Sequence, residues 1–332
     1  MRKKIFIDGS AGTTGLRIRE RLASRKDLEL VLLPDELRKD AAARRDALNA
    51  ADVAFLCLPD AAAVEAVSLV ENPATVVIDT STAHRTADGW EYGFPELAGR
   101  RERIAKAKRI ANPGCHASGF IALVEPLVRV GLVARDAKLC AFSLTGYSGG
   151  GKKMIAQYEE ELRAPLGGSG ALPRPLSGNL FLGGRQYALA QVHKHLPEMA
   201  KICGLINAPC FSPIVVPHLS GMEVTVQLHG VGVEAVKDCY REYYGAVGRE
   251  TGVARHGLVV FCDDPAAAEG GFLSSAGLSG RDDMEVSVHG NDDRLVLVSR
   301  FDNLGKGASG AAIQNMNLVL GCAEDEGLVR SH

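Results

Sequence analysis

The sequence predicts an α/β fold in which a parallel-sheet domain stands beside a second, α+β domain with a mostly antiparallel sheet. Over the first third of the chain, short apolar runs alternate with helical stretches, which is the pattern of a parallel sheet wound with helices. The middle of the chain has strand-like runs, and 332 residues exceed what one hydrophobic core usually organises. Two domains are therefore expected.

The composition is that of a globular protein, with 46% hydrophobic and 23% charged residues. The formal net charge of −2 provides no basic field that would attract nucleic acid or a membrane surface, so small-molecule partners are expected. No apolar run approaches the roughly 18 residues of a membrane helix, and the N-terminus becomes a strand before a signal sequence could form. These features predict a cytoplasmic protein.

Eight cysteines are scattered along the chain without CxxC spacing, in a protein too long to need disulfide staples. Most of them are expected to be buried thiols. No metal site is expected, because the cysteines lack the paired spacing of a structural zinc site.

The chain opens with a strand, a glycine turn and a helix. Residues 5–7 form an apolar run suited to a buried parallel strand, and residues 16–22 carry apolar side chains at helical spacing. Between them, Gly9, Gly12 and Gly15 have the spacing GxxGxxG. It is a relative of the Rossmann fingerprint, in which glycines let the backbone approach a pyrophosphate at a helix N-terminus. A glycine turn without a ligand is the alternative.

Further apolar strands at 28–34, 51–59 and 75–81 make the first domain a Rossmann-type parallel sheet that binds a nucleotide. An acidic residue after the second strand usually binds the ribose of NAD, but here Asp35 is followed closely by Arg38. This pattern leaves NAD and NADP open. A solvated helix face is the alternative explanation for the cations there.

Cys115 differs from the other cysteines because a tight turn at 112–114 precedes it and a helix begins there. That helix has apolar positions that include Ile121 and Leu127. At a helix N-terminus the unsatisfied amides favour a thiolate, the form of cysteine that attacks carbon. We therefore predict a nucleophile, with a buried structural cysteine as the alternative.

A cysteine nucleophile needs a partner that moves protons. His193 and His195 alternate with Lys194 at the end of a strand-like run over 186–193, so both imidazoles are expected on one face before Pro197 begins a helix. A metal pair is disfavoured because no third ligand stands at a familiar spacing. Polar residues at a sheet edge are the other alternative to a Cys–His pair.

The middle of the chain predicts an α+β domain with an amphipathic helix over 235–250. The stretch 166–179 is rich in glycine and proline and is expected to be a surface excursion. A final strand leads through a glycine turn into a helix with apolar side chains available for packing. The expected strands of the middle and end of the chain are 138–146, 186–193, 211–230 and 294–301.

Six blocks, in order and spacing, carry a resemblance to a known family: 5–15, 77–85, 111–119, 145–155, 193–199 and 302–321. Together they resemble the short type of N-acetyl-γ-glutamyl-phosphate reductase, an arginine-biosynthesis enzyme related to aspartate-semialdehyde dehydrogenase, over nearly the whole chain. The resemblance implies a homodimer or homotetramer. It also implies an NADP-binding, Rossmann-like domain of residues 1–114 and 301–332 and a catalytic and oligomerisation domain of residues 115–300.

The resemblance further implies a reaction. Cys115 attacks the acyl carbon of N-acetyl-γ-glutamyl phosphate, phosphate leaves, and hydride from NADPH converts the thioester to N-acetylglutamate 5-semialdehyde. The acid/base role falls on the histidine pair, and we favour His195, with His193 and Tyr187 binding or orienting the substrate.

The family's contacts are carried over residue by residue. Asn303 is expected to approach the nicotinamide amide. From the residues themselves, Ser148, Gly149 and Gly150 are expected to offer backbone amides to an anion, with Lys152 nearby, and a flexible loop or a tight glycine turn is the alternative. The expected cofactor contacts are Gly9, Ser10, Gly12, Thr13, Thr14, Gly15, Leu58, Pro59, Ser81 and Asn303. The expected substrate contacts are Arg85, Asn112, Ser148, Gly149 and Tyr187. For Arg85 the alternative is an exposed loop arginine.

Two other functional classes are considered. A dehydrogenase acting on aspartyl phosphate would keep the cysteine turn but carry a different histidine segment, so the block at 193–199 argues against it. A nucleotide sensor without catalysis would need the glycine turn but would have no use for Cys115 beside two histidines. Selective, substrate-protected alkylation of Cys115 separates an enzyme from a sensor.

Overall fold

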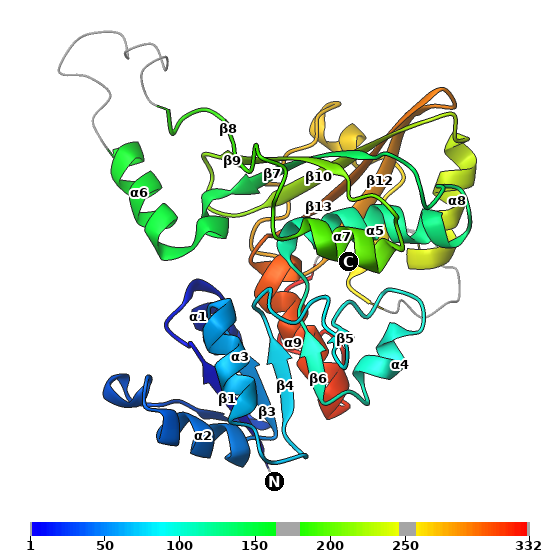
Figure 1. Ribbon diagram of the computed structural model, residues 1–332. Coiled ribbons are helices and arrows are strands. Elements are labelled where there is room, and N and C mark those ends of the chain that lie inside the picture. Colours follow the sequence, from blue (N-terminus) through cyan, green and yellow to red (C-terminus); the bar gives the residue numbers. More distant parts are fainter. Residues whose placement is uncertain (1, 164–179, 246–256, 331–332) are drawn as a thin grey trace, which may run out of the picture.

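Two β-sheets form the framework of the protein, and helices cover them (Figure 1). The computed structural model describes residues 2–163, 180–245 and 257–330. Within these residues the first sheet has six parallel strands in the order β2-β1-β3-β4-β6-β5. The second has seven in the order β11-β12-β13-β10-β7-β9-β8, with four antiparallel and two parallel pairings. The predicted fold class is therefore confirmed.

The first sheet is buried on both faces, because helices connect its parallel strands. Its strands are β1 (Lys3–Asp8), β2 (Leu28–Val31), β3 (Val53–Leu56), β4 (Val76–Asp79), β5 (Glu91–Tyr92) and β6 (Arg109–Ala111). The helices between them are α1 (Thr13–Leu22), α2 (Ala41–Ala50), α3 (Asp60–Ser68) and α4 (Arg100–Ile104). Successive side chains of β1 enter separate core clusters, with Ile5 and Ile7 in one and Phe6 in the other.

The second sheet has helices on one face, where its main core lies (Figure 1). These helices are α5 (Cys115–Arg129), α7 (Leu196–Cys203) and α8 (Val233–Tyr244), whereas α6 (Gly151–Arg163) extends to the side. The strands are β7 (Cys140–Gly146), β8 (Arg185–Gln186), β9 (Cys210–Val216), β10 (Met222–His229), β11 (Val259–Phe261), β12 (Met284–Asn291) and β13 (Arg294–Phe301). Side chains alternate along β7, where Ala141 and Ser143 are buried and Phe142 is exposed on the other face.

The C-terminal part of the chain returns to the first sheet. After β13 comes one turn of π-helix, Gly305–Ser309, and then α9 (Gly310–Leu320). Ile313 and Met316 of α9 pack in the same core cluster as Ile5 of β1. The return predicted for this last helix is confirmed, while the exact domain boundaries stay a prediction.

One predicted strand is wrong. Of the strand predicted over 186–193, only Gln186 pairs with β9, together with Arg185 before it. The chain then turns, with positive φ at Ala188 (53°) and Gln191 (57°). The side chain of Gln191 exchanges two 2.8 Å hydrogen bonds with the backbone of Phe211, and these replace further strand pairing. His193 and His195 therefore lie on an irregular loop.

The expectation that most cysteines are buried is also wrong. Cys203 and Cys262 are buried, Cys140 and Cys210 are exposed on the strands β7 and β9, and the other four are intermediate. The register explains the exposed pair, because residues at these positions face away from the core.

The helix predicted over 235–250 ends at Tyr244, and its last predicted residues, like the stretch 166–179, lie outside the described residues. Among the described residues, no helix combines the length and the apolar composition needed to cross a bilayer.

Candidate active site

A cavity of about 660 Å³ lies where the two sheets meet, and Cys115 lines it. Most of the predicted site is brought together there: Thr13, Thr14, Arg85, Asn112, Ser148, Gly149, Gly150, Tyr187, His193, His195 and Asn303. A neighbouring groove of about 290 Å³ shares part of this lining and adds Gly12, Leu58, Pro59 and Ser81. Of the predicted cofactor and substrate residues, Gly9, Ser10 and Gly15 line neither hollow, and the others line one or both.

The glycine turn that follows β1 is closely packed. Gly9 has φ +84°, and a Cβ there would lie 2.3 Å from the carbonyl oxygen of Cys57. A Cβ at Gly15 would lie 2.5 Å from the carbonyl oxygen of Gly9. Gly12 stands before α1 and offers no capping side chain, so the first amides of the helix are left for a ligand at the groove. The glycines therefore let the turn pack closely against its own backbone, and the free amides at the start of α1 fit the pyrophosphate of a dinucleotide.

Cys115 is the first residue of α5, as predicted. Burial raises the pKa of its thiol, while the Arg85 guanidinium and the backbone amide of His116 oppose that change. Desolvation of the charged sulfur thus opposes the thiolate that the helix start favours, and it is the larger effect on the pKa of the thiol. A raised pKa means that Cys115 needs a base to become the nucleophile.

Three histidines surround this part of the cavity. The ring centroids of His193 and His195 are 4.7 Å apart, and each lies 5.5 Å from that of His116. The backbone amide of His195 donates to Nδ1 of His193 at 3.2 Å, which leaves Nε2 of His193 as the protonated ring nitrogen in its neutral form. His195 is 4% exposed, and its Nδ1 is buried with no partner among the described residues.

All three imidazoles are neutral at pH 7. Burial lowers the pKa of His116 to about 3 and that of His193 to about 4, and the Lys194 ammonium adds to both effects. Burial together with the Arg85 guanidinium holds the pKa of His195 well below its ordinary value. A neutral imidazole can accept a proton, which is what a resting thiol requires.

His116 is a site residue that the sequence analysis missed, although it follows Cys115 within the same motif. Its Nδ1 lies 2.7 Å from Oγ of Ser143, and its Nε2 lies 2.7 Å from the hydroxyl of Tyr187. His116 therefore fixes Tyr187 at the cavity wall.

Glu198 was also missed, although it belongs to the block 193–199. It is 1% exposed, and its carboxylate accepts hydrogen bonds from the Tyr92 hydroxyl at 2.6 Å and the Gly114 amide at 2.8 Å. It also pairs with Arg85 at 3.3 Å. A single buried carboxylate thus fixes both the turn before the nucleophile and a cavity cation.

Arg85 is not a surface residue, since 9% of its side chain is exposed. Besides Glu198 it donates to the carbonyl oxygens of Asn112 at 3.0 Å and Thr80 at 3.1 Å. The alternative of an exposed loop arginine is excluded. Its remaining N–H groups are the ones a substrate could use.

The predicted polar contacts on the opposite wall are partly engaged within the protein. The Asn303 amide donates to Oγ of Ser148 at 2.9 Å and accepts from the backbone of Gly221 at 2.9 Å. The Ser148 amide donates to the carbonyl of Leu219 at 3.0 Å, so the expected group of three free amides is wrong at Ser148. Gly149 and Gly150 belong to the short 3₁₀ turn Tyr147–Gly150 at the cavity wall, so a role of their amides in anion binding stays a prediction.

The Asn112 side chain is also committed. It donates to the carbonyl of Ala308 at 3.0 Å and accepts from Asn315 at 3.2 Å. Asn112 therefore joins the cysteine turn to the C-terminal segment. Its contact with substrate stays a prediction.

Two cations at the cavity were missed. Arg185 lies with its guanidinium 4.2 Å from the ring centroid of Phe181 and 4.9 Å from that of Tyr158, and its Nε donates to the Tyr158 hydroxyl at 3.0 Å. Lys194, between the two predicted histidines, lines both the cavity and the groove. Lys194 stands inside the block 193–199, and Arg185 directly precedes the predicted strand over 186–193. Their positive charge at these places could have indicated both.

The described residues contain no group of three or more histidine, cysteine, aspartate or glutamate side chains arranged to hold a metal ion.

Comparison with known proteins agrees with this geometry. Residues 4–107 match the family model described as semialdehyde dehydrogenase, NAD binding domain. The solved structure titled aspartate semialdehyde dehydrogenase II complexed with ASA, from Vibrio cholerae, covers 97% of this chain and 99% of its own, with a TM-score of 0.72 at 17% identity. A Candida albicans aspartate semialdehyde dehydrogenase with NADP has a TM-score of 0.62 at 16% identity, covering 97% and 99%. These likenesses show the fold.

Relatives of higher identity show the family. A Brucella anthropi protein named N-acetyl-gamma-glutamyl-phosphate reductase is 45% identical over 325 residues, covering 97% of this chain and 99% of its own. A Burkholderia ambifaria protein of the same name is 42% identical over 328 residues, covering 96% of each. Identity at this level over almost the whole of both chains shows that this protein belongs to the N-acetyl-γ-glutamyl-phosphate reductase family.

Proposed function

We propose that the protein reduces N-acetyl-γ-glutamyl phosphate to N-acetylglutamate 5-semialdehyde and phosphate with NADPH, a step of arginine biosynthesis. The observation that carries the proposal is a cysteine at a helix start in a cavity that it shares with the buried His195 and the half-buried His193, next to the glycine-turn groove. The names of the relatives supply the substrate.

His195 acts as the base in this proposal. Its neutral imidazole takes the proton of the Cys115 thiol, and the thiolate sulfur then bonds to the acyl carbon as the carbon–oxygen bond to phosphate breaks. The imidazolium formed is close to the Arg85 guanidinium, which disfavours its charge, so it is a ready proton donor later in the cycle. His193, held by the His195 amide, and Tyr187, held by His116, orient the substrate.

The residues that would hold the cofactor are those of the glycine turn, with Leu58, Pro59 and Ser81 along the groove and Asn303 at the reaction cavity. When bound, the nicotinamide supplies the hydride. The preference for NADPH rests on the cation Arg38 just after β2, where it pairs with Asp35, and on the family resemblance.

The anionic ends of the substrate match the cations of the cavity. We assign the phosphate to Arg85 and the carboxylate to Arg185, whose guanidinium is held in place by two aromatic rings. Asn112 shapes the wall between them.

The exposed part of the other face of the second sheet, over β7 and β9, supports a homodimer or homotetramer. Phe142 is 43% exposed on that face, and the partly exposed Ile214 and Leu144 are paired in register next to it. An apolar sheet face of this kind is normally covered by another surface. Light scattering should give a molar mass of two or four subunits, and Phe142→Asp should shift the molar mass towards that of one subunit.

A cytoplasmic location is part of the proposal. All eight cysteines are free, as expected for a protein kept in a reducing compartment.

The test is the reverse reaction with purified protein, phosphate, NADP or NAD, and either N-acetylglutamate 5-semialdehyde or aspartate semialdehyde, followed by the absorbance of the reduced cofactor. Phosphate-dependent reduction of NADP with the acetylated aldehyde supports the proposal. Preference for aspartate semialdehyde moves the substrate assignment to the other enzyme, and no reaction with either overturns it.

Cys115→Ser should fold normally and lose turnover by several orders of magnitude, because the serine hydroxyl is a far less acidic nucleophile. The matched control is Cys140→Ser on the exposed face of β7, which should keep wild-type turnover. Retained activity of Cys115→Ser would exclude the thioester.

A further inference from the structure

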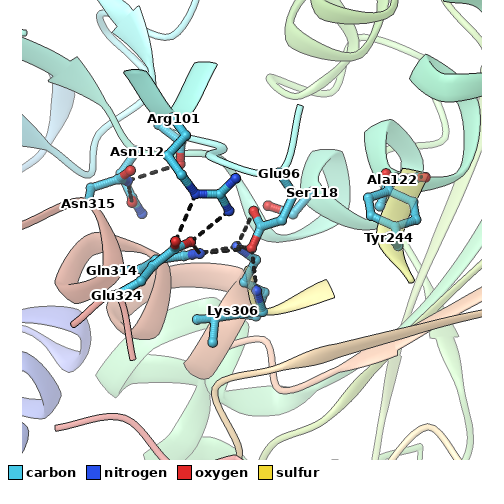
Figure 2. A network of polar contacts seen from close by, with 12 residues as sticks. Glu96, Arg101, Asn112, Ser118, Ala122, Tyr244, Lys306, Gln314, Asn315 and Glu324 are labelled. Atoms are coloured by element: carbon cyan, nitrogen blue, oxygen red, sulfur yellow. Dashed lines mark hydrogen bonds and ion pairs between the residues drawn. The ribbon is translucent and has the colours of Figure 1, made fainter. Parts of the chain in front are cut away.

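A buried polar network lies directly behind the π turn that walls the reaction cavity (Figure 2). Its centre is Lys306, which is fully buried; Nζ lies 2.8 Å from each carboxylate oxygen of Glu96 and 2.5 Å from Oε1 of Gln314. Gln314 donates to Glu96 at 2.8 Å and to Glu324 at 2.6 Å, and Arg101 donates to Glu324 at 2.8 Å. The network connects the π turn to α9, to α4 and to the loop after β5.

The ion pair of Lys306 and Glu96 also contacts the second sheet. Oε1 of Glu96 accepts from the Leu258 amide at 2.7 Å, immediately before β11, and the ring centroid of Phe94 lies 4.8 Å from Nζ of Lys306. The Glu96–Lys306 pair is therefore a junction between elements of both sheets. Neither residue lines the reaction cavity, and the mechanism above uses neither.

The neighbours of Lys306 do contact the nucleophile. A Cβ at Gly307 would lie 3.0 Å from Cβ of Cys115, so the backbone of the π turn packs against the reacting residue. The carbonyl of Ala308 accepts from the Asn112 side chain at 3.0 Å. A shift of the π turn therefore moves both the back of Cys115 and the turn that precedes it.

Stability alone does not explain this pair. Apolar side chains of similar volume often replace a buried ion pair at no loss of stability, because they avoid the desolvation of two charges. Three acceptor atoms on two residues, Glu96 and Gln314, fix the direction of the ion pair, so they allow one position of the Lys306 side chain and hence of its backbone. Single π turns are unfavourable by themselves and occur mostly at functional sites, so this one needs such an anchor.

We propose that Lys306 and Glu96 are positioning residues for the chemistry at Cys115, anchoring the π turn so that its backbone holds the nucleophile at the cavity wall. The effect on turnover rests on the proposed function. The reactivity of Cys115 towards an alkylating agent does not, because it is measured without substrate.

The first measurement is the rate of alkylation of Cys115 by iodoacetamide as a function of pH, followed peptide by peptide in a mass spectrometer. The variants are Lys306→Met and Glu96→Gln, and the exposed Cys140 and Cys210 are references within each sample. We expect the rate constant at Cys115 to change by about tenfold or more with a shifted pH midpoint, kcat to fall by about 10- to 100-fold, and KM to change much less.

The matched control is Arg44→Met, which breaks another buried ion pair, Arg44 with Asp8 at 3.0 Å, inside the first sheet domain. It should lower the melting temperature without changing the alkylation of Cys115. Equal alkylation in Lys306→Met and Arg44→Met would reduce the Lys306 pair to a structural role and overturn the proposal.

Should Lys306→Met fail to fold, the double variant Glu96→Gln/Lys306→Met leaves no unpaired buried charge. Wild-type alkylation and kcat in that folded variant would also overturn the proposal, and slowed chemistry with a near wild-type melting temperature supports it. If wild-type protein reacts with neither aldehyde, the proposed function fails while the alkylation result still decides this inference.

Discussion

Gly114, immediately before the nucleophile, is a position where one methyl group should be decisive. Its backbone angles, φ −80° and ψ 145°, suit alanine, so Gly114→Ala introduces no backbone strain. The added Cβ would lie 2.3 Å from Nη1 of Arg85 and 2.5 Å from Nε2 of His195. Since non-bonded atoms prefer about 3.5 Å, the two side chains must retreat by roughly 1 Å.

A displacement of roughly 1 Å in a catalytic constellation costs about 100-fold in rate, whereas overpacking costs about 1 to 3 kcal/mol of stability. We therefore expect Gly114→Ala to fold, to unfold at somewhat lower urea concentration, and to lose about 100-fold in kcat in the reverse assay. Gly183→Ala is the control, because no atom lies within 4 Å of its added Cβ. A Gly114→Ala enzyme with wild-type kcat would refute the assigned contacts of Arg85 and His195.

Three further predictions concern charge. The value of kcat/KM should stay constant as the pH falls well below 6.5, the ordinary pKa of histidine. Burial lowers the pKa of His193 to about 4 and also lowers that of His195, so the base stays neutral. A decrease of kcat/KM that begins near pH 6.5, the ordinary histidine pKa, would contradict this. The same lowered pKa values make the free energy of unfolding decrease as the pH falls from 6.5 towards 4, since the unfolded chain then binds protons that the folded chain does not, and urea unfolding at several pH values measures it. Glu198→Gln should lower the free energy of unfolding by about 3 kcal/mol, because it leaves the Arg85 guanidinium buried without its carboxylate partner. An unchanged urea midpoint would show that this ion pair does not contribute to stability.

The fold could be predicted where the sequence pattern is local. The strands around Ile5 and Ile78 are apolar on both faces, and the glycines and the cysteine turn mark helix starts, so the first sheet and α5 follow from short stretches. The strand β12 was missed, although Met284, Val286 and Val288 alternate in the sequence. The segment up to His193 was predicted as a strand because its composition suits one. Strand pairing, however, depends on a partner strand elsewhere in the chain. Here the side chain of Gln191 forms hydrogen bonds with the backbone of Phe211 in that partner strand, in place of strand pairing.

The site could be predicted as a set of residue types, and its electrostatics could not. Placement of Cys115 at a helix start was readable, whereas its burial, which sets the direction of its pKa, depends on packing between the two sheets. Glu198 stood within a recognised segment, yet nothing local indicates that its carboxylate accepts the Gly114 amide, 84 residues away in the sequence. Distance along the chain is what hides such contacts.

The polypeptide passes from one sheet to the other at Gly114–Cys115 and returns after Phe301, and the hydrogen bond from Asn112 to Ala308 places these two crossings side by side. Points near the axis of a rotation move least. If the sheets turn relative to each other to admit or release a dinucleotide, these two connecting segments define the pivot, and the pivot lies beside the nucleophile. The outer parts of the groove can then open widely while the reacting atoms stay in register, so ligand exchange and a precisely held thiol are compatible in one molecule.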